Sequence, residues 1–454
     1  MAPTSEKWTG RVGFVLATVG SAVGLGSVWK FPYEVGENGG GGFVLFYVLG
    51  LIVIVSPLML AEFAIGRAGQ SDARISIETV ARKHGARRRW GIVGVLGVVG
   101  SALILSFYSV IGGWALAYAC ETLWSGLPVA AADAVQARFD GFMSSFVKMA
   151  AYHSIFMGVT AWIVGRGVAH GIESATKILM PILGATLVGL AVHSLIAGDA
   201  QATFRYLFHI DLTRLTARAM LEAVGLGFFS IGVGLAVMIT YAAYAGPEIN
   251  LRSAAIIAIA GDTAISFVAG FAIFPIVFHN GLDPASGPGL MFVTLPLAFS
   301  AMPGGTTLAV AFFLLLTIAA LASAISLLEM PVAFACRSLG WGRSKSVAIT
   351  AVSIWLAGFF SIFSFNLWRE WFPLSAYPIF ASATFFDVLD FLTSNVLLPV
   401  GGLMTALFAG WVLPSRFFAS TLNLGSRTSS LLSFALRYAA PAGIAAATIM
   451  PFLF

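Results

Sequence analysis

Two stretches, residues 21–32 (SAVGLGSVWKFP) and 228–235 (FFSIGVGL), place glycines in the middle of apolar segments that are long enough to cross a membrane. Glycine is a poor helix former, so we expect both segments to be broken helices. A break inside a bilayer frees backbone N–H and C=O groups, which is tolerated only where protein or a polar cavity satisfies them. The two stretches therefore predict a site for ions and a charged solute.

The composition is that of a helical protein with many membrane spans. Of its 454 residues, 59% are hydrophobic and 10% are charged, and the mean hydropathy is +0.92. Because a span needs roughly 20 apolar residues, the hydropathy predicts eleven spans, near residues 11–35, 43–66, 90–123, 149–165, 171–197, 220–245, 252–279, 307–336, 346–366, 388–412 and 430–452. The last of these contains Arg437. We expect no cleavable signal peptide, because charged residues lead directly into a long first span.

The distribution of charge predicts the topology. Residues 67–89 carry seven Lys and Arg against Asp72 and Glu78, so the positive-inside rule makes this loop and the N-terminus cytoplasmic. An odd number of spans then puts the C-terminus outside. The net charge of +5 reflects this topology and an attraction to anionic lipid headgroups, and we expect no nucleic-acid partner.

The two interrupted spans indicate an internal repeat within a single transmembrane domain, residues 1–454. Spans 1 and 6 occupy corresponding places in two blocks of opposite topology, residues 1–198 (spans 1–5) and 199–415 (spans 6–10), and residues 416–454 hold span 11. Glycine-interrupted segments at matching positions of two halves point to the binding site of a transporter. Between the spans, we expect short surface helices in residues 126–148 and 199–219, and a helical hairpin over an external vestibule in residues 281–305.

Several motifs, spread over nearly the whole chain, resemble the neurotransmitter:sodium symporter family. They lie at residues 22–32, 37–43, 57–67, 171–181, 228–234, 239–244, 293–299 and 319–326, with Tyr108 before GGW. The resemblance implies an all-α polytopic membrane protein with a LeuT-like 5+5 inverted repeat, broken helices 1 and 6, and eleven transmembrane helices. It implies a Na⁺-coupled symporter in the bacterial cytoplasmic (inner) membrane that works by alternating access, for which a monomer is sufficient and a dimer is possible.

The break in span 1 suits a zwitterionic solute. Freed N–H groups and a half-helix N-terminus favour a carboxylate, and the carbonyls opposite suit Na⁺. By resemblance, Tyr108 donates its hydroxyl to that carboxylate and Phe229 is an aromatic lid, although a lone aromatic in a span is more often a core residue. The substrate site implied by the resemblance consists of Ala22, Val23, Gly24, Leu25, Gly26, Ile104, Tyr108, Phe229, Ser230, Gly232, Leu235, Ser323 and Leu327.

A carboxylate distinguishes the first sodium site implied by the resemblance. This site consists of Ala22, Ser27, Ser230 and Asp262. A charge at mid-span costs roughly 2.5–3.5 kcal/mol on insertion scales, which a bound cation offsets; the alternative is that Asp262 only bonds other helices. Chloride-dependent relatives bind Cl⁻ at the position of Ser266, so a built-in carboxylate predicts transport without chloride.

The second implied sodium site is less complete. It consists of Gly20, Val23, Ala319 and Ser323, and Ala322 stands where a hydroxyl residue is expected. The loss of one oxygen ligand weakens Na⁺ binding unless water replaces it. The number of coupled ions, one or two, is therefore open.

Other residues are assigned to gates and supports by the same resemblance. Lys30 and Asp390 match an external ion pair, in which Lys lacks the bidentate fork of Arg. The implied cytoplasmic gate consists of Trp8, Tyr244, Glu6 and Arg337. We read Glu6 and Arg337 as a reversed ion pair, with headgroup-facing charges as the alternative. Gly171 and Pro181 match an element that unwinds span 5, although proline also kinks ordinary spans, and Glu62 matches a structural carboxylate that caps broken backbone.

The implied pocket has no charged side chain, which favours a zwitterion with an apolar side chain. The glycines in the Gly232-Val233-Gly234 sequence leave volume there, so we predict L-amino acids of large hydrophobic or aromatic type. Another small zwitterion and a non-transporting sensor remain alternatives. Nothing repeats as a channel filter. The scattered His and the two Cys, Cys120 and Cys336 near opposite faces, form no enzyme or metal set.

Overall fold

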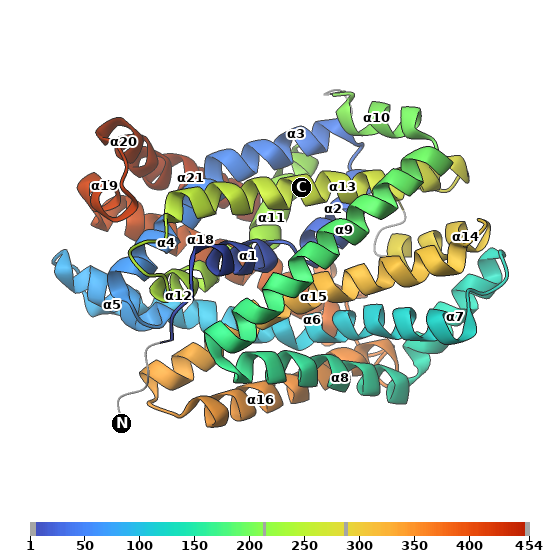
Figure 1. The fold of residues 1–454 in the computed structure, drawn as a ribbon, viewed down its shortest axis with the longest axis horizontal. Coiled ribbons are helices and arrows are strands. Elements are labelled where there is room, and N and C mark those ends of the chain that lie inside the picture. The colour runs from blue at the N-terminus through green and yellow to red at the C-terminus, as the bar shows by residue number, and fades with distance from the viewer. Residues whose placement is uncertain (1–5, 212–214, 286–288, 450–454) are drawn as a thin grey trace.

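The computed structural model describes residues 6–211, 215–285 and 289–449. It is a bundle of long helices that run side by side along the longest axis of the molecule (Figure 1). Helix α5 (Ala73–Lys83) and the N-terminal segment lie at one end of the bundle. Helices α7 (Ala132–Ser144), α10 (Ala200–Phe208) and α14 (Leu295–Ser300) lie at the other. We call these ends the α5 face and the α7 face.

The expected spans are present with small shifts of their ends. Within the described residues, nine helices are long and apolar enough to cross a membrane: Gly41–Gly69 (containing α3, Gly41–Gly50, and α4, Ser56–Gly69), Arg88–Ser125 (α6, Ile92–Ser125), Phe146–Gly165 (α8), Val168–Ala197 (α9, Ser174–Ala197), Leu251–His279 (α13), Gly305–Ser338 (α15), Arg343–Phe365 (α16), Phe385–Val412 (α17, Phe385–Phe391, and α18, Leu398–Leu407) and Ser426–Thr448 (α20, Ser426–Phe434, and the start of α21, Ala440–Ile449). A bent pair, Arg11–Ala22 with Gly26–Glu37, is the tenth candidate span. Two shorter helices, α11 (Ala217–Ile231) and α12 (Val237–Ala243), lie where the sequence predicts the sixth span.

The first span is broken where the sequence predicts it. Helix α1 (Arg11–Ala22) ends at Val23, whose backbone is extended (φ −79°, ψ 100°). The chain resumes as a π-helical turn, Gly26–Lys30, that continues into α2 (Phe31–Glu37). The two halves meet at an angle of 47°. The break thus separates two half-helices that point their ends at the same central region.

The sixth span is broken by residues in the left-handed region. Helix α11 (Ala217–Ile231) and helix α12 (Val237–Ala243) flank Gly232, Gly234 and Ala236, which have φ values of +71°, +91° and +58°. A Cβ on Gly234 would lie 2.6 Å from the carbonyl oxygen of Leu398. Glycine is therefore required at 234 by its backbone conformation and by the close approach of span 10.

The connections between spans carry short helices. The segments 126–148 and 199–219 contain α7 and α10, as expected, and α19 (Ser415–Leu422) lies beside α20. The hairpin expected over residues 281–305 includes positions 286–288, which lie outside the described residues. Its later part forms one apolar helix, Leu290–Ser300.

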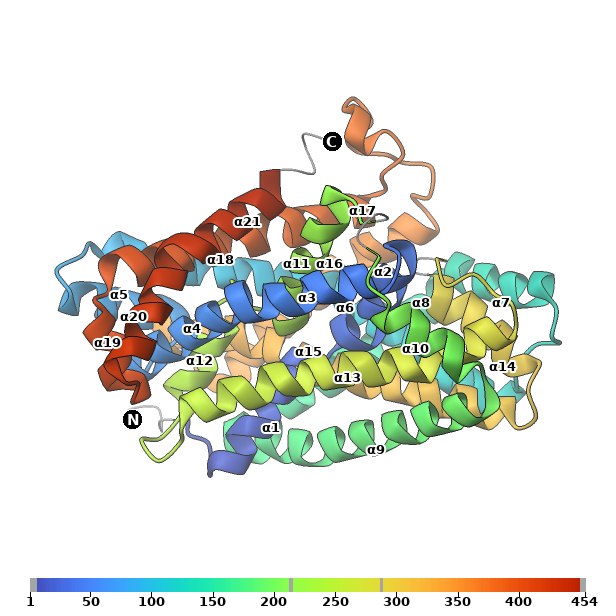
Figure 2. The same ribbon diagram turned by 90° about the horizontal axis from the view of Figure 1, so that it is seen from above.

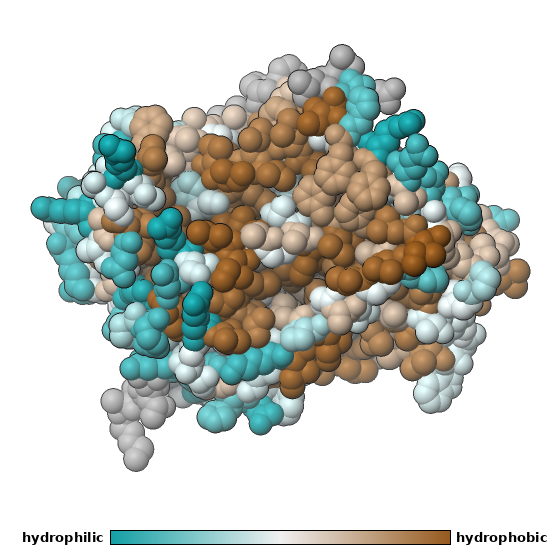
Figure 3. Space-filling view, turned by 45° about the horizontal axis from the view of Figure 1, so that its top comes forward, coloured by the Kyte–Doolittle hydropathy of each residue, from teal (hydrophilic) through white to brown (hydrophobic). Residues whose placement is uncertain are grey.

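The packing leaves an apolar belt around a polar centre. Helix α6 packs along α15, α13 packs along α9, and α1 contacts α13, α15 and α9. Apolar side chains cover the middle of the surface in Figure 3, and hydrophilic ones gather toward its ends. The chain is a multi-pass membrane protein of all-α class with broken helices 1 and 6.

Candidate substrate and ion site

A buried carboxylate joins the two broken helices. Ser27, just after the first break, and Ser230, at the end of α11, both donate to Oδ1 of Asp262, the bond from Ser230 being 2.7 Å long. The two serine hydroxyls lie 3.0 Å apart. Asp262 is fully buried in α13. The structure thus brings together three residues of the first implied sodium site, while Ala22 ends α1 beside the break.

Tyr47 is a further member of this cluster that the sequence reasoning missed. Its hydroxyl donates a 2.9 Å bond to Oδ2 of Asp262 and lies 3.4 Å from Oγ of Ser266. Tyr47 is completely buried in span 2. A single tyrosine in an apolar run carries little signal, because most such residues are simply core aromatics.

Tyr108 contacts the broken backbone of span 1 directly. The amide N–H of Leu25 donates to the Tyr108 hydroxyl at 3.2 Å. A Cβ on Gly24 would lie 2.3 Å from Oγ of Ser323 and 2.9 Å from the Tyr108 hydroxyl oxygen. Gly24 therefore allows α6 and α15 to approach the break.

An inner cavity of about 40 Å³ lies beside this backbone. Its lining contains ten of the predicted substrate residues: Gly24, Gly26, Ile104, Tyr108, Phe229, Ser230, Gly232, Leu235, Ser323 and Leu327. Ser21, Val237, Ser326 and Leu398 also line it and were not predicted. Ala22 and Val23 are buried outside the lining, and Leu25 faces the vestibule described next.

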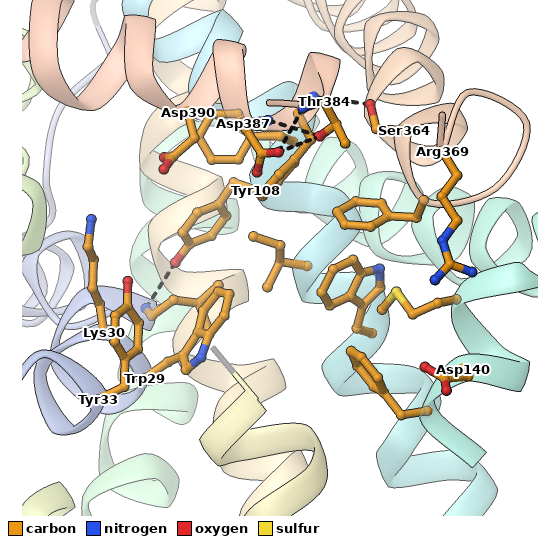
Figure 4. Close-up of a pocket in the computed structure, with 18 of the residues that line it drawn as sticks. Trp29, Lys30, Tyr33, Tyr108, Asp140, Ser364, Arg369, Thr384, Asp387 and Asp390 are labelled. Atoms are coloured by element: carbon orange, nitrogen blue, oxygen red, sulfur yellow. Dashed lines mark hydrogen bonds between the residues drawn. The ribbon is translucent and has the colours of Figure 1, made fainter. Parts of the chain in front are cut away.

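A larger vestibule of about 550 Å³ lies above the inner cavity, toward the α7 face (Figure 4). Lys30 and Asp390 lie on one side of it, and Asp140 and Arg369 lie on the other. Tyr108 and Phe229 line both spaces. Phe229 thus lies at the boundary between the vestibule and the inner cavity, which is the place expected of a lid.

The expected external ion pair is not formed in this conformation. The Lys30 ammonium lies 4.7 Å from the centre of the Phe229 ring, and Oδ1 of Asp390 accepts a 3.0 Å bond from Ser394. Among the ion pairs that join described residues, none links Lys30 to Asp390. The two residues share the vestibule wall, and a cation–π contact holds the lysine over the Phe229 ring.

At the opposite end of the site, the N-terminal segment is tied to span 6. The indole N–H of Trp8 donates to the carbonyl of Tyr241 at 2.9 Å, and its backbone N–H donates to the carbonyl of Tyr244 at 3.2 Å. The Tyr244 hydroxyl donates to Oε1 of Glu329 at 2.9 Å. These bonds hold the N-terminal segment and span 8 against the second half of span 6.

The proposed pairing of Glu6 with Arg337 is wrong. Glu6 forms its ion pair with Arg343, at 3.3 Å, and Arg343 also pairs with the fully buried Glu329 at 2.7 Å. Arg343 begins α16 and donates to the carbonyl of Val164 as well. A buried carboxylate needs a close cation, and Arg343 meets that need from an adjacent helix, whereas Arg337 stays half-exposed at the end of α15.

Of the remaining predicted residues, Glu62 bonds the break of span 6, and Gly171 and Pro181 lie in span 5. Oε1 of Glu62 accepts a 2.8 Å bond from the amide of Gly234, at the break of span 6. Gly171 lies in the π-helical turn Val168–Glu173 that begins span 5, and Pro181 lies within α9.

The residues of the second implied sodium site are gathered where α1, α9 and α15 meet. Ser323 donates to the carbonyl of Ser21 at 3.3 Å, and Ala319 is fully buried. A Cβ on Gly20 would lie 3.1 Å from Sδ of Met180 and 3.5 Å from Cβ of Ala322. Val23, in the extended break, is also buried. The methyl group of Ala322 therefore occupies a position where the resemblance expects a hydroxyl.

Two broken spans that meet at a buried polar cluster, with a vestibule toward one face, are the architecture of a membrane transporter. A family model described as the sodium:neurotransmitter symporter family matches residues 5–154 and 144–449, and the chain belongs to that family.

Individual relatives agree with this assignment. The chain is 36% identical to an uncharacterized sodium-dependent transporter, YhdH, of Bacillus subtilis, over 93% of this chain and 91% of that protein. It is 32% identical to an uncharacterized sodium-dependent transporter of Haemophilus influenzae, over 90% and 89%. The crystal structure of MhsT in complex with L-phenylalanine superposes with a TM-score of 0.90 at 40% identity, covering 98% of this chain and 99% of that chain.

Proposed function

We propose that this chain is a Na⁺-coupled, chloride-independent symporter that imports L-amino acids with large hydrophobic or aromatic side chains. The observation that carries the proposal is the buried Asp262 carboxylate, to which Ser27 and Ser230 of the two broken helices both donate. A buried carboxylate is costly without a cation. Na⁺ prefers the oxygen ligands that hydroxyl, carboxylate and carbonyl groups provide there. The relatives described as sodium-dependent transporters support the same ion.

The break in span 1 is proposed to bind the carboxylate of the amino acid. It exposes backbone amides beside Tyr108, and Gly24 and Gly26 keep that backbone open to the cavity. Half-helix ends carry partial charges that suit the two ends of a zwitterion. A bound amino acid would then lie directly above the Na⁺ held by Asp262.

The side-chain part of the cavity is apolar. Ile104, Leu235, Val237, Leu327 and Leu398 line it, and a Cβ on Gly232 would meet no atom within 4 Å. The cavity volume of about 40 Å³ is well below the roughly 300 Å³ of common ligand pockets. An aromatic substrate therefore requires the Phe229 lid or the unwound segment of span 6 to move. The L-phenylalanine complex of MhsT supports this substrate class.

The two faces are proposed to alternate in access. The vestibule above Phe229 is the external side, and the Trp8, Tyr244, Glu6 and Arg343 contacts form the cytoplasmic gate. The basic loop that contains α5 lies on this second face, so the positive-inside rule orients it toward the cytoplasm. In this orientation the N-terminus is cytoplasmic and the C-terminus lies outside.

The number of coupled ions is proposed to be one or two. The first site has a full negative charge, and the second, at Gly20, Val23, Ala319 and Ser323, lacks a hydroxyl at Ala322. Fewer oxygen ligands weaken cation binding. Chloride is not needed for charge balance, because the Asp262 carboxylate supplies the negative charge close to Ser266. The Tyr47 hydroxyl contacts both residues.

The test is uptake of labelled L-leucine or L-phenylalanine into proteoliposomes that hold a Na⁺ gradient, with and without chloride. We expect uptake only with the gradient, unchanged when gluconate replaces chloride, and inhibited by Trp and Tyr more than by glycine or GABA. Asp262→Asn should abolish this uptake in chloride-free buffer. Its matched control is Asp133→Asn, on the exposed surface of α7. Substrate binding without uptake would show a sensor, and inhibition by glycine or GABA ahead of Leu, Trp and Tyr would show a different zwitterion.

A further inference from the structure

Arg437 is a charged residue within span 11 that the transport site does not use. It lies in a π-helical turn, Ala435–Ala439, and is only half-buried. Its Nε donates to the carbonyl of Gly410 at 2.8 Å. Among the ion pairs that join described residues, none includes Arg437. Arginines inside membrane spans normally have an anionic or carbonyl partner for the whole guanidinium group.

Exposed aromatic side chains surround this arginine. The guanidinium carbon lies 5.3 Å from the centre of the Trp411 ring, and the indole N–H of Trp411 donates to the Arg437 carbonyl at 3.2 Å. Tyr438 contacts the Trp411 ring, and Phe434 contacts Tyr438. Trp411, Tyr438 and Phe434 are 59%, 50% and 60% exposed. Exposed Trp and Tyr next to a cation are typical of the headgroup level of a bilayer.

The position of the helix agrees with that level. Figure 2 shows the helix of α20 and α21 running obliquely across α18, with α20 next to α19 at the α5 end of the bundle. Arg437 lies between α20 and α21. Arg416 on α19 and Arg427 on α20 are exposed at the same end. The surface around Arg437 is therefore cationic at its edge and apolar along its length.

We propose that Arg437, Trp411 and Tyr438 bind the phosphate group of an anionic phospholipid in the leaflet at the α5 face. With Nε bonded to Gly410, the two terminal nitrogens of Arg437 form no hydrogen bond to a described residue. A guanidinium fork matches two phosphate oxygens, and the two rings flank the headgroup. The acyl chains extend from there along α21, away from the α5 end of the bundle. This site is independent of the transport function proposed above.

The test is native mass spectrometry of the full chain, released from nanodiscs of phosphatidylglycerol and phosphatidylcholine. Arg437→Gln removes the phosphate partner, and Arg427→Gln is the matched control, because it removes the same charge from an exposed position of the same helix. We expect the wild type and Arg427→Gln to retain one phosphatidylglycerol. Arg437→Gln should bind it about fivefold more weakly, as expected for one basic residue at a lipid surface. Equal retention by Arg437→Gln and the wild type would overturn the proposal.

Further measurements separate the alternatives. Arg437→Lys keeps the positive charge but lacks the planar fork, so we expect it to retain an intermediate amount of phosphatidylglycerol. The size-exclusion elution profiles of Arg437→Lys and Arg437→Gln report whether both variants fold correctly. If Arg437→Gln does not fold, Trp411→Leu replaces it and should also lower phosphatidylglycerol retention. Displacement of the lipid by inorganic phosphate would show a free-anion site. A dimer that dissociates in Arg437→Gln without loss of lipid would show a second copy as the partner. Either result contradicts the proposed lipid site.

Discussion

The Tyr47 hydroxyl lies 2.9 Å from Oδ2 of Asp262 and donates a hydrogen bond to it. Ser27 and Ser230 bond the other oxygen, Oδ1. The carboxylate is therefore held from two sides, with one oxygen directed toward the broken helices and the other toward span 2. This arrangement presents a preformed anion at the crossing of the breaks, and several predictions depend on it.

Asp262→Asn should abolish Na⁺-driven uptake in chloride-free buffer, because the neutral amide cannot supply the negative charge that balances the cation. The measurement is initial uptake in proteoliposomes with gluconate or chloride as the only anion. Asp133→Asn should behave as wild type in both. Chloride-dependent uptake by the wild type, or uptake without chloride that survives in Asp262→Asn, would contradict the assignment.

Tyr47→Phe should weaken Na⁺ binding while leaving the fold intact. The ring still packs against Phe31, but Oδ2 of Asp262 loses its donor and the carboxylate is less well oriented. A hydrogen bond to a charged group contributes about 1.5–3 kcal/mol, so the Na⁺ concentration for half-maximal uptake should rise roughly tenfold or more. An unchanged Na⁺ dependence would show that Tyr47 has no part in the ion site.

Gly24→Ala should prevent substrate binding, because the new methyl group would lie 2.3 Å from Oγ of Ser323 and 2.9 Å from the Tyr108 hydroxyl oxygen. Gly184→Ala, at a position where a Cβ meets nothing within 4 Å, is the control for a glycine-to-alanine change in a span. Equilibrium binding of labelled L-leucine distinguishes the two. Normal binding by Gly24→Ala would place the amino acid elsewhere.

Arg343→Gln should lower the free energy of unfolding by about 3–5 kcal/mol, since it leaves the carboxylate of Glu329 buried without a cation, with the Tyr244 hydroxyl as its remaining donor. The double variant Arg343→Gln with Glu329→Gln should regain most of that stability, and thermal unfolding in detergent measures both. Arg337→Gln, a surface change, should fall within about 0.5 kcal/mol of wild type. If Arg337→Gln were the more damaging variant, the network described at the α5 face would be wrong.

Much of the architecture was predictable because its causes are local. Glycines at 24, 26, 232 and 234 weaken helices wherever they stand, and long apolar segments can only be spans. Asp262 was identifiable as a candidate site residue, because a charge at mid-span is rare. The ends of the spans shifted by a few residues, since fraying and π-helical turns are set by neighbouring helices.

The partners of individual side chains were less predictable. Glu6 meets Arg343 and not Arg337, although both arginines lie near the end of span 8 in sequence. Lys30 lies over Phe229 and not against Asp390. A long charged side chain at a helix end can reach several partners, so sequence spacing does not select among them.

The amino-acid sequence by itself determined the spans, the two breaks, their inverted arrangement and the carboxylate between them, because hydropathy and backbone propensity act within a segment. Only the tertiary structure decided that Tyr47 orients Asp262, that Phe229 separates two cavities, and that Arg343 bridges Glu6 to Glu329. Each of these depends on side chains from helices far apart in the chain. Packing brings them within a few ångströms, and no local pattern encodes that distance.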